Sequence, residues 1–373
     1  MDFDLYMPTK TISGRGAFER AANELKNLGK RVCIITGGGS ALKSGALDDA
    51  KKILTSIGAQ FIIYDKIGPN PLISICHDAG REAFRFSADY IMAIGGGSPL
   101  DAGKAAAVYA ANPGLSPIEL YDYTKWLKQP LPIIAVGTTA GTGSEVTAVA
   151  VLTIDEQNRK KSITNKYCYP KISICDPTYT QTMPLDVTIS TALDALSHAT
   201  EGWFNPKRSD AATCYAKMGL PLIWHGLKAL SKIDKDTQPT YSLRESLYYG
   251  SLWAGMVLNL CGTAFPHPMG YVLTEEFGIP HGRACTAFLP ELVRRGMETD
   301  SDRAAEYFNL LGCKWPEFSL VVDTLTDVKV QMTDEQIERY AQRWHGLHNF
   351  DNSPGGYSAE QAAAFLRREF SQD

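Results

Sequence analysis

The sequence predicts an α/β fold with a parallel sheet in its N-terminal half and an all-helical fold in its C-terminal half. Short apolar runs alternate with helical patterns up to about residue 175, as in a parallel sheet covered by helices on both faces. From about residue 184 onward the strand signal disappears and long helical patterns follow. A chain of 373 residues is long enough for two domains, which we place at 1–180 and 181–373.

The expected elements follow from the period of the apolar residues. Strands are expected at 30–36, 60–64, 90–94, 132–136, 149–154 and 172–175, with a hairpin turn at 155–158. Helices are expected at 46–57, 74–85, 187–203, 211–230, 243–260, 303–311, 334–343 and 359–370. The segment 176–184 carries two prolines and is the expected boundary between the domains.

Glycine-rich loops follow three of the expected strands, at the edge where parallel sheets bind ligands. The loop 95–98 is the best phosphate-binding candidate, since Gly96 and Gly97 let backbone amides approach an anion closely. Ser98 and Asp101 form a capping pattern at a helix start, whose free N–H groups attract phosphate. A well-capped turn without a ligand is the alternative for this loop.

A second loop, Gly137 to Ser144, carries hydroxyl groups that could hold a ribose, a pyrophosphate or a nicotinamide amide. A tight hydrogen-bonded turn is again the alternative. The candidate side chains are Thr138, Thr139, Thr142 and Ser144. The loops therefore leave two readings open, a nucleotide-binding edge of the sheet and a set of tight turns without a ligand.

Composition and charge exclude several classes of protein. A net charge of -4 provides no basic surface for nucleic acid. The acidic start of the chain lacks the positive charge of a signal peptide, and no apolar run is long enough to span a bilayer. The eight cysteines are scattered singly, which favours neither disulfides nor a thiolate zinc site. We expect a cytoplasmic protein that binds no membrane. A homodimer is a separate expectation, on which composition and charge do not bear.

The C-terminal half contains a candidate metal site. Asp194 and His198 are four residues apart in an expected helix, so their side chains share one face. His267 and His281 follow in two proline- and glycine-containing motifs. One carboxylate and three imidazoles suit a divalent metal that prefers nitrogen and oxygen ligands. Alternatively, each histidine caps or fills its own locality.

Four motifs together give the chain a resemblance to the iron-containing (group III) alcohol dehydrogenase family. They are GGGSPLDAGKA at 95–105, TTAGTGSEVT at 138–147, DALSHATEG at 194–202 and HPMGYVLTEEFGIPHG at 267–282. The resemblance implies a Rossmann-like dinucleotide-binding α/β domain followed by an all-helical metal-binding domain. It implies Fe(II), or Zn(II), on Asp194, His198, His267 and His281. Asn70 and Lys161 match cofactor-contacting positions, although Lys161 taken alone reads as a solvated charge.

The cofactor preference rests on a departure from the family pattern. Many members carry an aspartate over the adenosine ribose where this chain has Gly37, followed by Gly38, Gly39 and Ser40. Without a carboxylate a 2′-phosphate meets no like charge, so NADP(H) is expected over NAD(H). Asp65, after the next strand, argues the other way, because an acidic residue there commonly binds a free ribose.

The implied reaction is reversible hydride transfer between a small primary alcohol or aldehyde and NADP(H), with the metal as Lewis acid. Many relatives have a second histidine where this chain has Tyr271, which either packs in the substrate pocket or relays a proton. Rival readings are a dehydroquinate-synthase-like cyclase, an NAD-dependent diol or lactaldehyde-type reductase, and a binding protein without turnover. The cyclase would need lysines and arginines around its zinc, and none lies between His267 and His281.

Overall fold

The computed structural model of the chain describes residues 3, 5–157 and 159–371. They divide into two compact units. The α/β unit comprises Tyr6–Pro184 and Thr240–Tyr248, and the helical unit takes the remaining described residues. The division thus lies four residues beyond the expected 180/181 boundary, and a short later segment belongs to the α/β unit.

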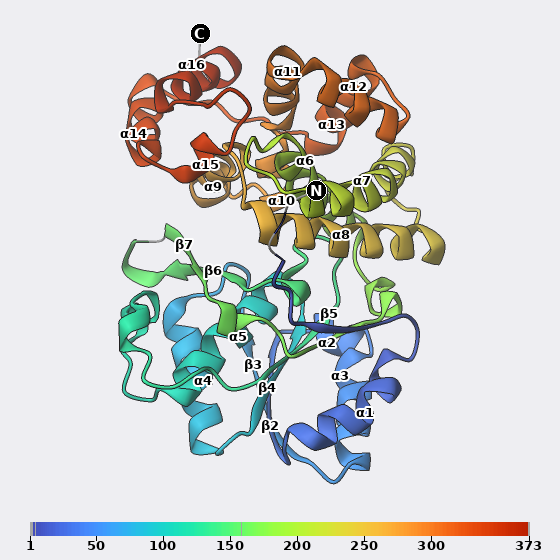
Figure 1. Cartoon of the computed structure of the whole chain (residues 1–373), viewed down its shortest axis with the longest axis vertical. Coiled ribbons are helices and arrows are strands. Elements are labelled where there is room, and N and C mark those ends of the chain that lie inside the picture. The colour runs from blue at the N-terminus through green and yellow to red at the C-terminus, as the bar shows by residue number, and fades with distance from the viewer. Residues whose placement is uncertain (1–2, 4, 158, 372–373) are drawn as a thin grey trace. The chain divides into compact units, whose positions relative to one another are not determined.

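The α/β unit is built on a six-stranded, all-parallel sheet in the order β1-β8-β5-β4-β2-β3 (Figure 1). The strands are β1 (Lys10–Ser13), β2 (Arg31–Gly37), β3 (Gln60–Ile67), β4 (Tyr90–Gly95), β5 (Ile133–Gly137) and β8 (Ile172–Cys175). The expected parallel sheet is confirmed. The central strands carry near-continuous apolar runs because helices bury both faces.

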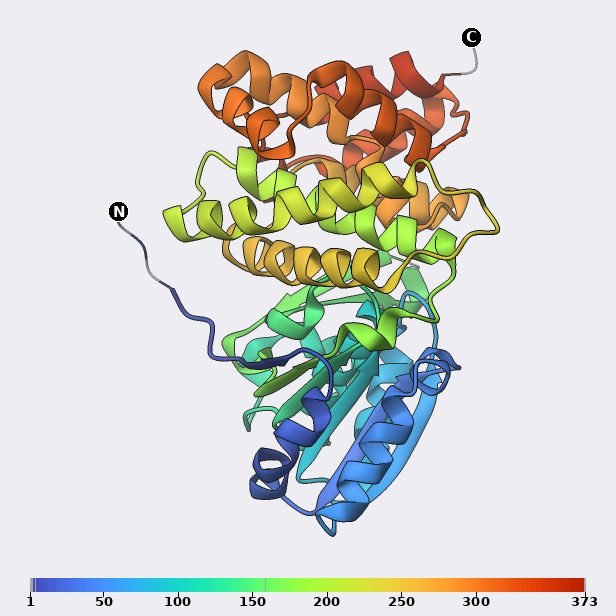
Figure 2. The same ribbon diagram turned by 90° about the vertical axis from the view of Figure 1, so that its right-hand side faces the viewer.

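Alternate residues of the central strands point into two cores. Cys33 and Ile91 pack with α4 (Ile73–Arg85) and α5 (Gly97–Ala111) on one face. Val32 and Met92 pack with α1 (Ala17–Leu28) and α3 (Ala46–Ser56) on the other face. Figure 2 shows these two helices in blue beside the sheet. Cys33 and Cys175 are buried, as expected of small core residues.

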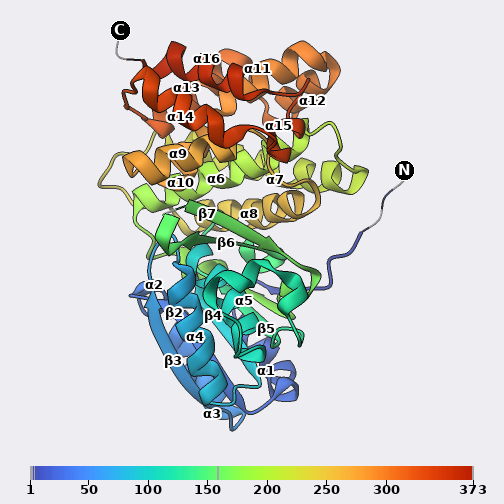
Figure 3. The ribbon, with the colours of Figure 1, turned by 90° about the vertical axis from the view of Figure 1, so that its left-hand side faces the viewer.

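A two-stranded antiparallel sheet, β6 (Val149–Ile154) with β7 (Arg159–Thr164), stands apart from the main sheet (Figure 3). The expected strand 149–154 and its return are confirmed. A one-turn 3-10 helix, Asp155–Gln157, occupies the described part of the expected hairpin turn, whose last residue lies outside the described residues. In this unit the sequence analysis missed β1, α1 and the four-residue helix α2 (Ser40–Lys43).

The helical unit begins with α6 (Leu185–Phe204), most of which is buried. The other helices of this unit are α7 (Asp210–Leu230), the part of α8 (Tyr241–Cys261) from Tyr249 onward, α9 (Pro266–Phe277), α10 (His281–Thr286), α11 (Leu289–Thr299), α12 (Ser301–Leu311), α13 (Trp315–Thr326), α14 (Asp334–Trp344), α15 (His348–Asp351) and α16 (Ala359–Phe370). All six expected helices exist. In this unit the sequence analysis missed α9, α10, α11, α13 and α15. In the described part of the chain, no helix is both long and apolar enough to cross a bilayer.

Candidate metal centre and nucleotide loops

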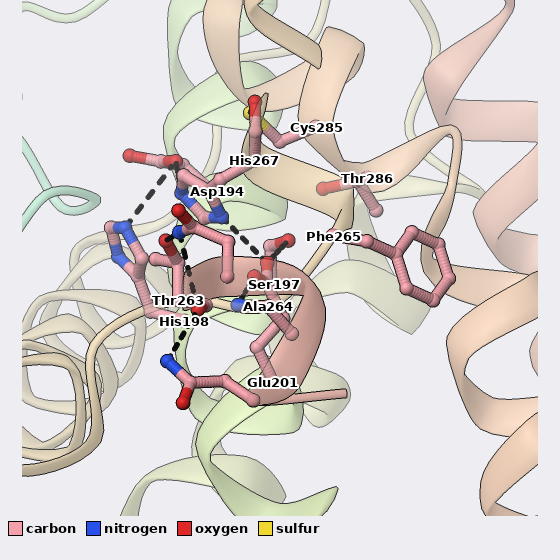
Figure 4. Close-up of polar contacts among 12 residues, drawn as sticks. Asp194, Ser197, His198, Glu201, Thr263, Ala264, Phe265, His267, Cys285 and Thr286 are labelled. Atoms are coloured by element: carbon pink, nitrogen blue, oxygen red, sulfur yellow. Dashed lines mark hydrogen bonds and ion pairs between the residues drawn. The ribbon is translucent and has the colours of Figure 1, made fainter. Parts of the chain in front are cut away.

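Helix α6 places Asp194 and His198 one turn apart, as their spacing predicts, and both side chains are buried (Figure 4). His267 is the second residue of α9, directly after Pro266, which suits the first helical position. His281 is the first residue of α10. Three helices that are distant in sequence therefore bring the four predicted ligands together.

Two glycines allow these helices to approach closely. A Cβ on Gly282 would lie 1.8 Å from the Ser190 carbonyl oxygen of α6, so only glycine lets α10 begin there. A Cβ on Gly270 would lie 2.6 Å from the Cα of Cys285, so α9 and α10 touch through their backbones. The glycines of the HPMG and PHG motifs thus position the histidines.

The three imidazoles converge on one oxygen of the Asp194 carboxylate. Asp194 Oδ1 lies 3.9 Å from His198 Nε2 and 3.7 Å from the Nε2 atoms of both His267 and His281. Ligands about 2.1 Å from a tetrahedral metal are about 3.4 Å apart, so these three distances to Asp194 Oδ1 exceed that spacing by only a few tenths of an ångström. The donor set fits a divalent metal.

Two buried atoms support this fit. Among the described residues, neither Asp194 Oδ1 nor His267 Nε2 has a hydrogen-bond partner. Burial opposes ionisation of Asp194, but the neighbouring histidines outweigh it and hold its pKa well below the ordinary value. Burial alone would lower the pKa of His267, but the Glu201 and Asp194 carboxylates raise it to about 9. The centre therefore attracts positive charge.

Glu201, which the sequence analysis missed, orients His267. Its Oε1 atom lies 2.6 Å from His267 Nδ1, while Ser197 Oγ donates to Oε1 at 2.5 Å. The backbone N–H of Ala264 donates to Oε2 at 2.6 Å (Figure 4). With Nδ1 held by this carboxylate, Nε2 points toward Asp194, the arrangement common around metal-binding histidines. The available signal was position: Glu201 follows Asp194 by two helical turns.

Tyr271 lies beside the ligands. Its ring stacks on His281 with centroids 5.6 Å apart and an interplanar angle of 26°. Burial raises the pKa of Tyr271 well above its ordinary value. The phenol therefore keeps its proton at neutral pH and is a poor proton relay.

Three candidate nucleotide loops begin side by side in the α/β unit. They follow β2, β4 and β5, which are neighbours in the sheet, and Gly95 pairs with Gly137 in register. The loop after β4 and the loop after β5 also touch. A Cβ on Gly97 would lie 2.6 Å from Thr142 Cγ2, and a Cβ on Gly96 would lie 3.0 Å from Thr139 Cγ2. Thr138 Oγ1 is buried without a hydrogen-bond partner among the described residues.

The side chains of Asp101 and Ser144 form a hydrogen bond with each other. Ser144 Oγ donates to Asp101 Oδ1 at 2.6 Å, and the Val151 N–H donates to Oδ2 at 2.8 Å. Lys104, which the sequence analysis did not single out, is fully buried and donates to the Ser144 carbonyl at 2.8 Å. This network connects α5 to the loop after β5. Both Asp101 oxygens already accept hydrogen bonds within the protein, so Asp101 is less available to contact a pyrophosphate than expected.

In the loop after β2, the position where family members carry an aspartate is closely packed. Gly37 ends β2, and a Cβ there would lie 2.7 Å from the carbonyl oxygen of Ile67 in β3. Gly38 is exposed with open space around its Cα, and a Cβ on Gly39 would lie 3.9 Å from Lys43 Cε. The room for a side chain or a ligand is therefore at Gly38 and Gly39, next to α2 (Ser40–Lys43).

The remaining candidates are spread over the α/β unit. Asn70 is exposed with a φ of 50°, and its carbonyl accepts from Thr153 Oγ1 at 3.2 Å. The Lys161 ammonium on β7 lies 4.5 Å from the centre of the Tyr121 ring. Asp65 is exposed on β3. The structure brings none of these three into contact with the glycine loops through a described hydrogen bond.

Comparisons with known proteins agree across the chain. The family described as iron-containing alcohol dehydrogenase matches residues 8–177, and its C-terminal family matches 188–344. The 1,3-propanediol dehydrogenase of Klebsiella pneumoniae is 32% identical over 83% of this chain and 79% of its own length. The long-chain primary alcohol dehydrogenase of Thermoanaerobacter ethanolicus is 33% identical over 82% and 77%. A crystal structure of an iron-containing alcohol dehydrogenase from Thermotoga maritima matches with a TM-score of 0.89 at 32% identity, covering 98% of this chain and 99% of that one.

Proposed function

Because the chain belongs to the iron-containing alcohol dehydrogenase family, we propose that it transfers a hydride between a small primary alcohol, or its aldehyde, and NADP(H). The convergence of three imidazoles on Asp194 Oδ1 is the observation that carries the proposal. The proposed ligands are Asp194, His198, His267 and His281, and the proposed metal is Fe(II) or Zn(II). A bound divalent metal supplies a Lewis acid for the alcohol or carbonyl oxygen.

The side chains around the centre have distinct tasks in this proposal. Asp194, His198 and His267 are buried, whereas the His281 side chain is 29% exposed, so substrate approaches from the His281 side. Tyr271 forms an apolar wall there, since its ring stacks on His281 and its raised pKa keeps the phenolic proton in place. Glu201 holds His267 in one orientation.

The cofactor preference rests on the loop after β2. The open space at Gly38 lacks a carboxylate, and the Lys43 side chain reaches back toward Gly39, which suits a 2′-phosphate. Family membership alone does not decide, because the relatives include an NADPH-dependent butanol dehydrogenase of Clostridium saccharobutylicum (26% identical over 92% of this chain) and an NAD-dependent methanol dehydrogenase of Bacillus methanolicus (28% over 83%).

A second candidate is an NAD-dependent diol reductase. The 1,3-propanediol dehydrogenase among the relatives favours a small diol or hydroxyaldehyde as substrate, and the exposed Asp65 favours a free ribose. The cytoplasmic location and the homodimer stay predictions.

The test combines metal analysis with a substrate panel. Protein purified without oxygen is analysed for iron and zinc and assayed with simple aldehydes and hydroxyaldehydes, using NADPH and NADH in parallel. Net NADPH oxidation that needs bound metal is the expected result. Metal-independent turnover, or metal-loaded protein that oxidises neither cofactor with any aldehyde, would contradict the proposal.

A further inference from the structure

Glu145 is a buried carboxyl group beside the loop after β5 that neither the proposed metal ligands nor the proposed cofactor contacts include. It directly follows Ser144, the last residue of that loop, and is 2% exposed. Within the described part of the chain, its Oε1 atom is buried and has no hydrogen-bond partner. A buried carboxyl oxygen without a partner costs free energy, and it costs more when the group is ionised. The protonation state of Glu145 therefore matters to the residues that surround it.

The Glu145 side chain packs against the first residue of the loop. A Cβ on Gly137 would lie 2.6 Å from Glu145 Oε1, so the carboxyl occupies space that any other residue at 137 would fill. The backbone of Glu145 is held on the sheet, because its carbonyl oxygen accepts a hydrogen bond from Ser173 Oγ of β8. Glu145 thus connects the two ends of the loop, since it follows the last residue and approaches the first.

Thr138 relates this contact to the candidate cofactor site. It is next to Gly137, and its Oγ1 atom is buried with no hydrogen-bond partner among the residues that the structure describes. The Thr138 N–H donates to the Gly95 carbonyl at 2.9 Å, which ties Thr138 to the start of the loop after β4. A displacement of Gly137 therefore moves a candidate cofactor contact.

The titratable groups that face Glu145 come from three elements. Lys104 and Asp101 belong to α5, Tyr248 lies in the first part of α8, and Cys175 ends β8. Strand β5 offers none, since its residues are apolar or glycine. Lys104 and Asp101 form an ion pair at 3.9 Å, so their charges act in opposite senses on Glu145.

The Glu145 carboxyl titrates near neutral pH in this environment. Burial raises the pKa of Glu145 from 4.5 to about 7, although Lys104 and the Tyr248 phenol act against burial. Burial also holds the pKa values of Tyr248 and Cys175 well above their ordinary values, so both groups stay protonated. Glu145 is thus neutral below about pH 7 and ionised above it.

We propose that Glu145 is a positioning residue for the cofactor: its neutral carboxyl holds the loop after β5 in the binding conformation, and its ionised form does not. The proposal rests on the proposed function, since it takes this loop to bind NADP(H) or NAD(H). Ionised Glu145 leaves a buried charge with an unmet oxygen at Gly137, so the start of the loop moves to admit water. The negative charge also opposes the phosphates of the cofactor. Both effects weaken binding.

The consequence is a cofactor affinity that falls as pH rises. When only the neutral form binds, the apparent Kd equals the intrinsic Kd divided by the neutral fraction. Below about pH 7 most of the protein is neutral at Glu145, so Kd changes little there. Above that pH the neutral fraction falls by about tenfold per pH unit, and Kd should rise in proportion.

The test measures the Kd of NADPH and of NADH by quenching of tryptophan fluorescence, from about pH 6 to about pH 9, with the whole protein. The 2′-phosphate of NADPH itself titrates near pH 6, so NADH, which lacks it, serves as the reference. In the wild type, the Kd of both cofactors should rise above about pH 7.

Three variants assign this rise to Glu145. Glu145→Gln keeps a neutral side chain of the same shape, so its Kd should match that of the wild type at low pH and stay constant. Tyr248→Phe removes a group that favours the ionised form, so the rise should begin at higher pH. Glu156→Gln, which changes an exposed glutamate of the same unit, should keep the wild-type profile.

The outcomes separate this proposal from the proposed function. A wild-type Kd that does not change with pH overturns the role of Glu145 and leaves the cofactor site intact. An equal rise in Glu145→Gln overturns that role as well, because another group is then responsible. Should Glu145→Gln fail to fold by circular dichroism, a shifted profile in Tyr248→Phe supports the role and an unshifted one overturns it. Wild-type protein that binds neither cofactor at any pH would instead overturn the cofactor part of the proposed function.

Discussion

The choice between NADP(H) and NAD(H) is tested most sharply by Gly38→Asp. The position is exposed, ends no strand, and has open space around its Cα, so an aspartate fits without moving the backbone. A new carboxylate there repels a 2′-phosphate and offers an acceptor to a free 2′-hydroxyl. If the proposed cofactor site is right, the variant disfavours NADPH and favours NADH at the same time.

The magnitude follows from the exposure of the loop. Two unit charges 4 Å apart interact by about 1 kcal/mol in bulk water and by about 4 kcal/mol at the effective dielectric of a protein surface. Gly38 is exposed, so the lower half of this range applies, and about 1.4 kcal/mol corresponds to tenfold. The ratio of kcat/KM for NADPH to that for NADH should fall by about tenfold in steady-state assays with one aldehyde.

Two companion variants make the result interpretable. Gly38→Asn has nearly the same shape without the charge and should shift the ratio far less than Gly38→Asp. Gly37→Asp, the change at the family position, puts a Cβ 2.7 Å from the Ile67 carbonyl oxygen and should lower thermal stability instead of changing the preference cleanly. A wild type that prefers NADH, or equal shifts in Gly38→Asp and Gly38→Asn, would refute the reasoning and point to Asp65.

Three further variants address the metal centre and the α/β core. Asp194→Ala removes the sole anionic member of the proposed ligand set. The variant should lose most bound metal and nearly all turnover, while its circular dichroism spectrum stays native. Alanine at the exposed His225, His345 or His348 is the control and should leave the metal content unchanged. Tyr271→Phe should change kcat little because the ring packs on His281; a loss of about a hundredfold would instead show that it relays a proton. Burial raises the pKa of Glu145 from 4.5 to about 7, so the folded protein holds a proton that the unfolded chain releases. That contribution to stability is complete below pH 4.5 and is lost as pH rises through 7. In the wild type this group should therefore lower the free energy of unfolding by roughly 3 kcal/mol between these pH values, and Glu145→Gln should remove that decrease. A thermal melting temperature with the same pH dependence in variant and wild type would contradict this.

Most of the sheet was predictable because its central strands are apolar runs that end in glycines. The elements that were missed carry weaker signals. Strand β1 lies at the sheet edge and is mostly exposed, so it has no apolar run. Helix α1 buries Ala17, Phe18, Ala21 and Leu25, a set in which two of four members are alanines. Helix α10 is only six residues long and follows Pro280, so periodicity has too little length to act on.

The candidate site also contains features that the sequence predicts and features that it does not. The one-turn spacing of Asp194 and His198 is local, and the helix fixes it. The pairing of Glu201 with His267 joins residues 66 apart in sequence, so only the packing of α9 against α6 reveals it. The network of Asp101 and Ser144 likewise spans 43 residues and turns two expected cofactor contacts into a brace between loops. The spacing within one helix could be predicted from the sequence, whereas contacts between residues far apart in the sequence could not.

The segment Thr240–Tyr248 has a consequence for synthesis on the ribosome. Within the α/β unit, the buried Arg244 donates to the carbonyl oxygens of Thr180 and Met183 at 2.8 and 2.9 Å. The chain must therefore be extended by 64 residues after Thr180 before this part of the first unit can close. At the usual rate of about 5–20 residues per second, the nascent sheet waits for seconds with these carbonyls unmet. A chain that ends between residues 184 and 240 contains all six strands of the main sheet but lacks the Arg244 hydrogen bonds that tie Thr180 and Met183 in place.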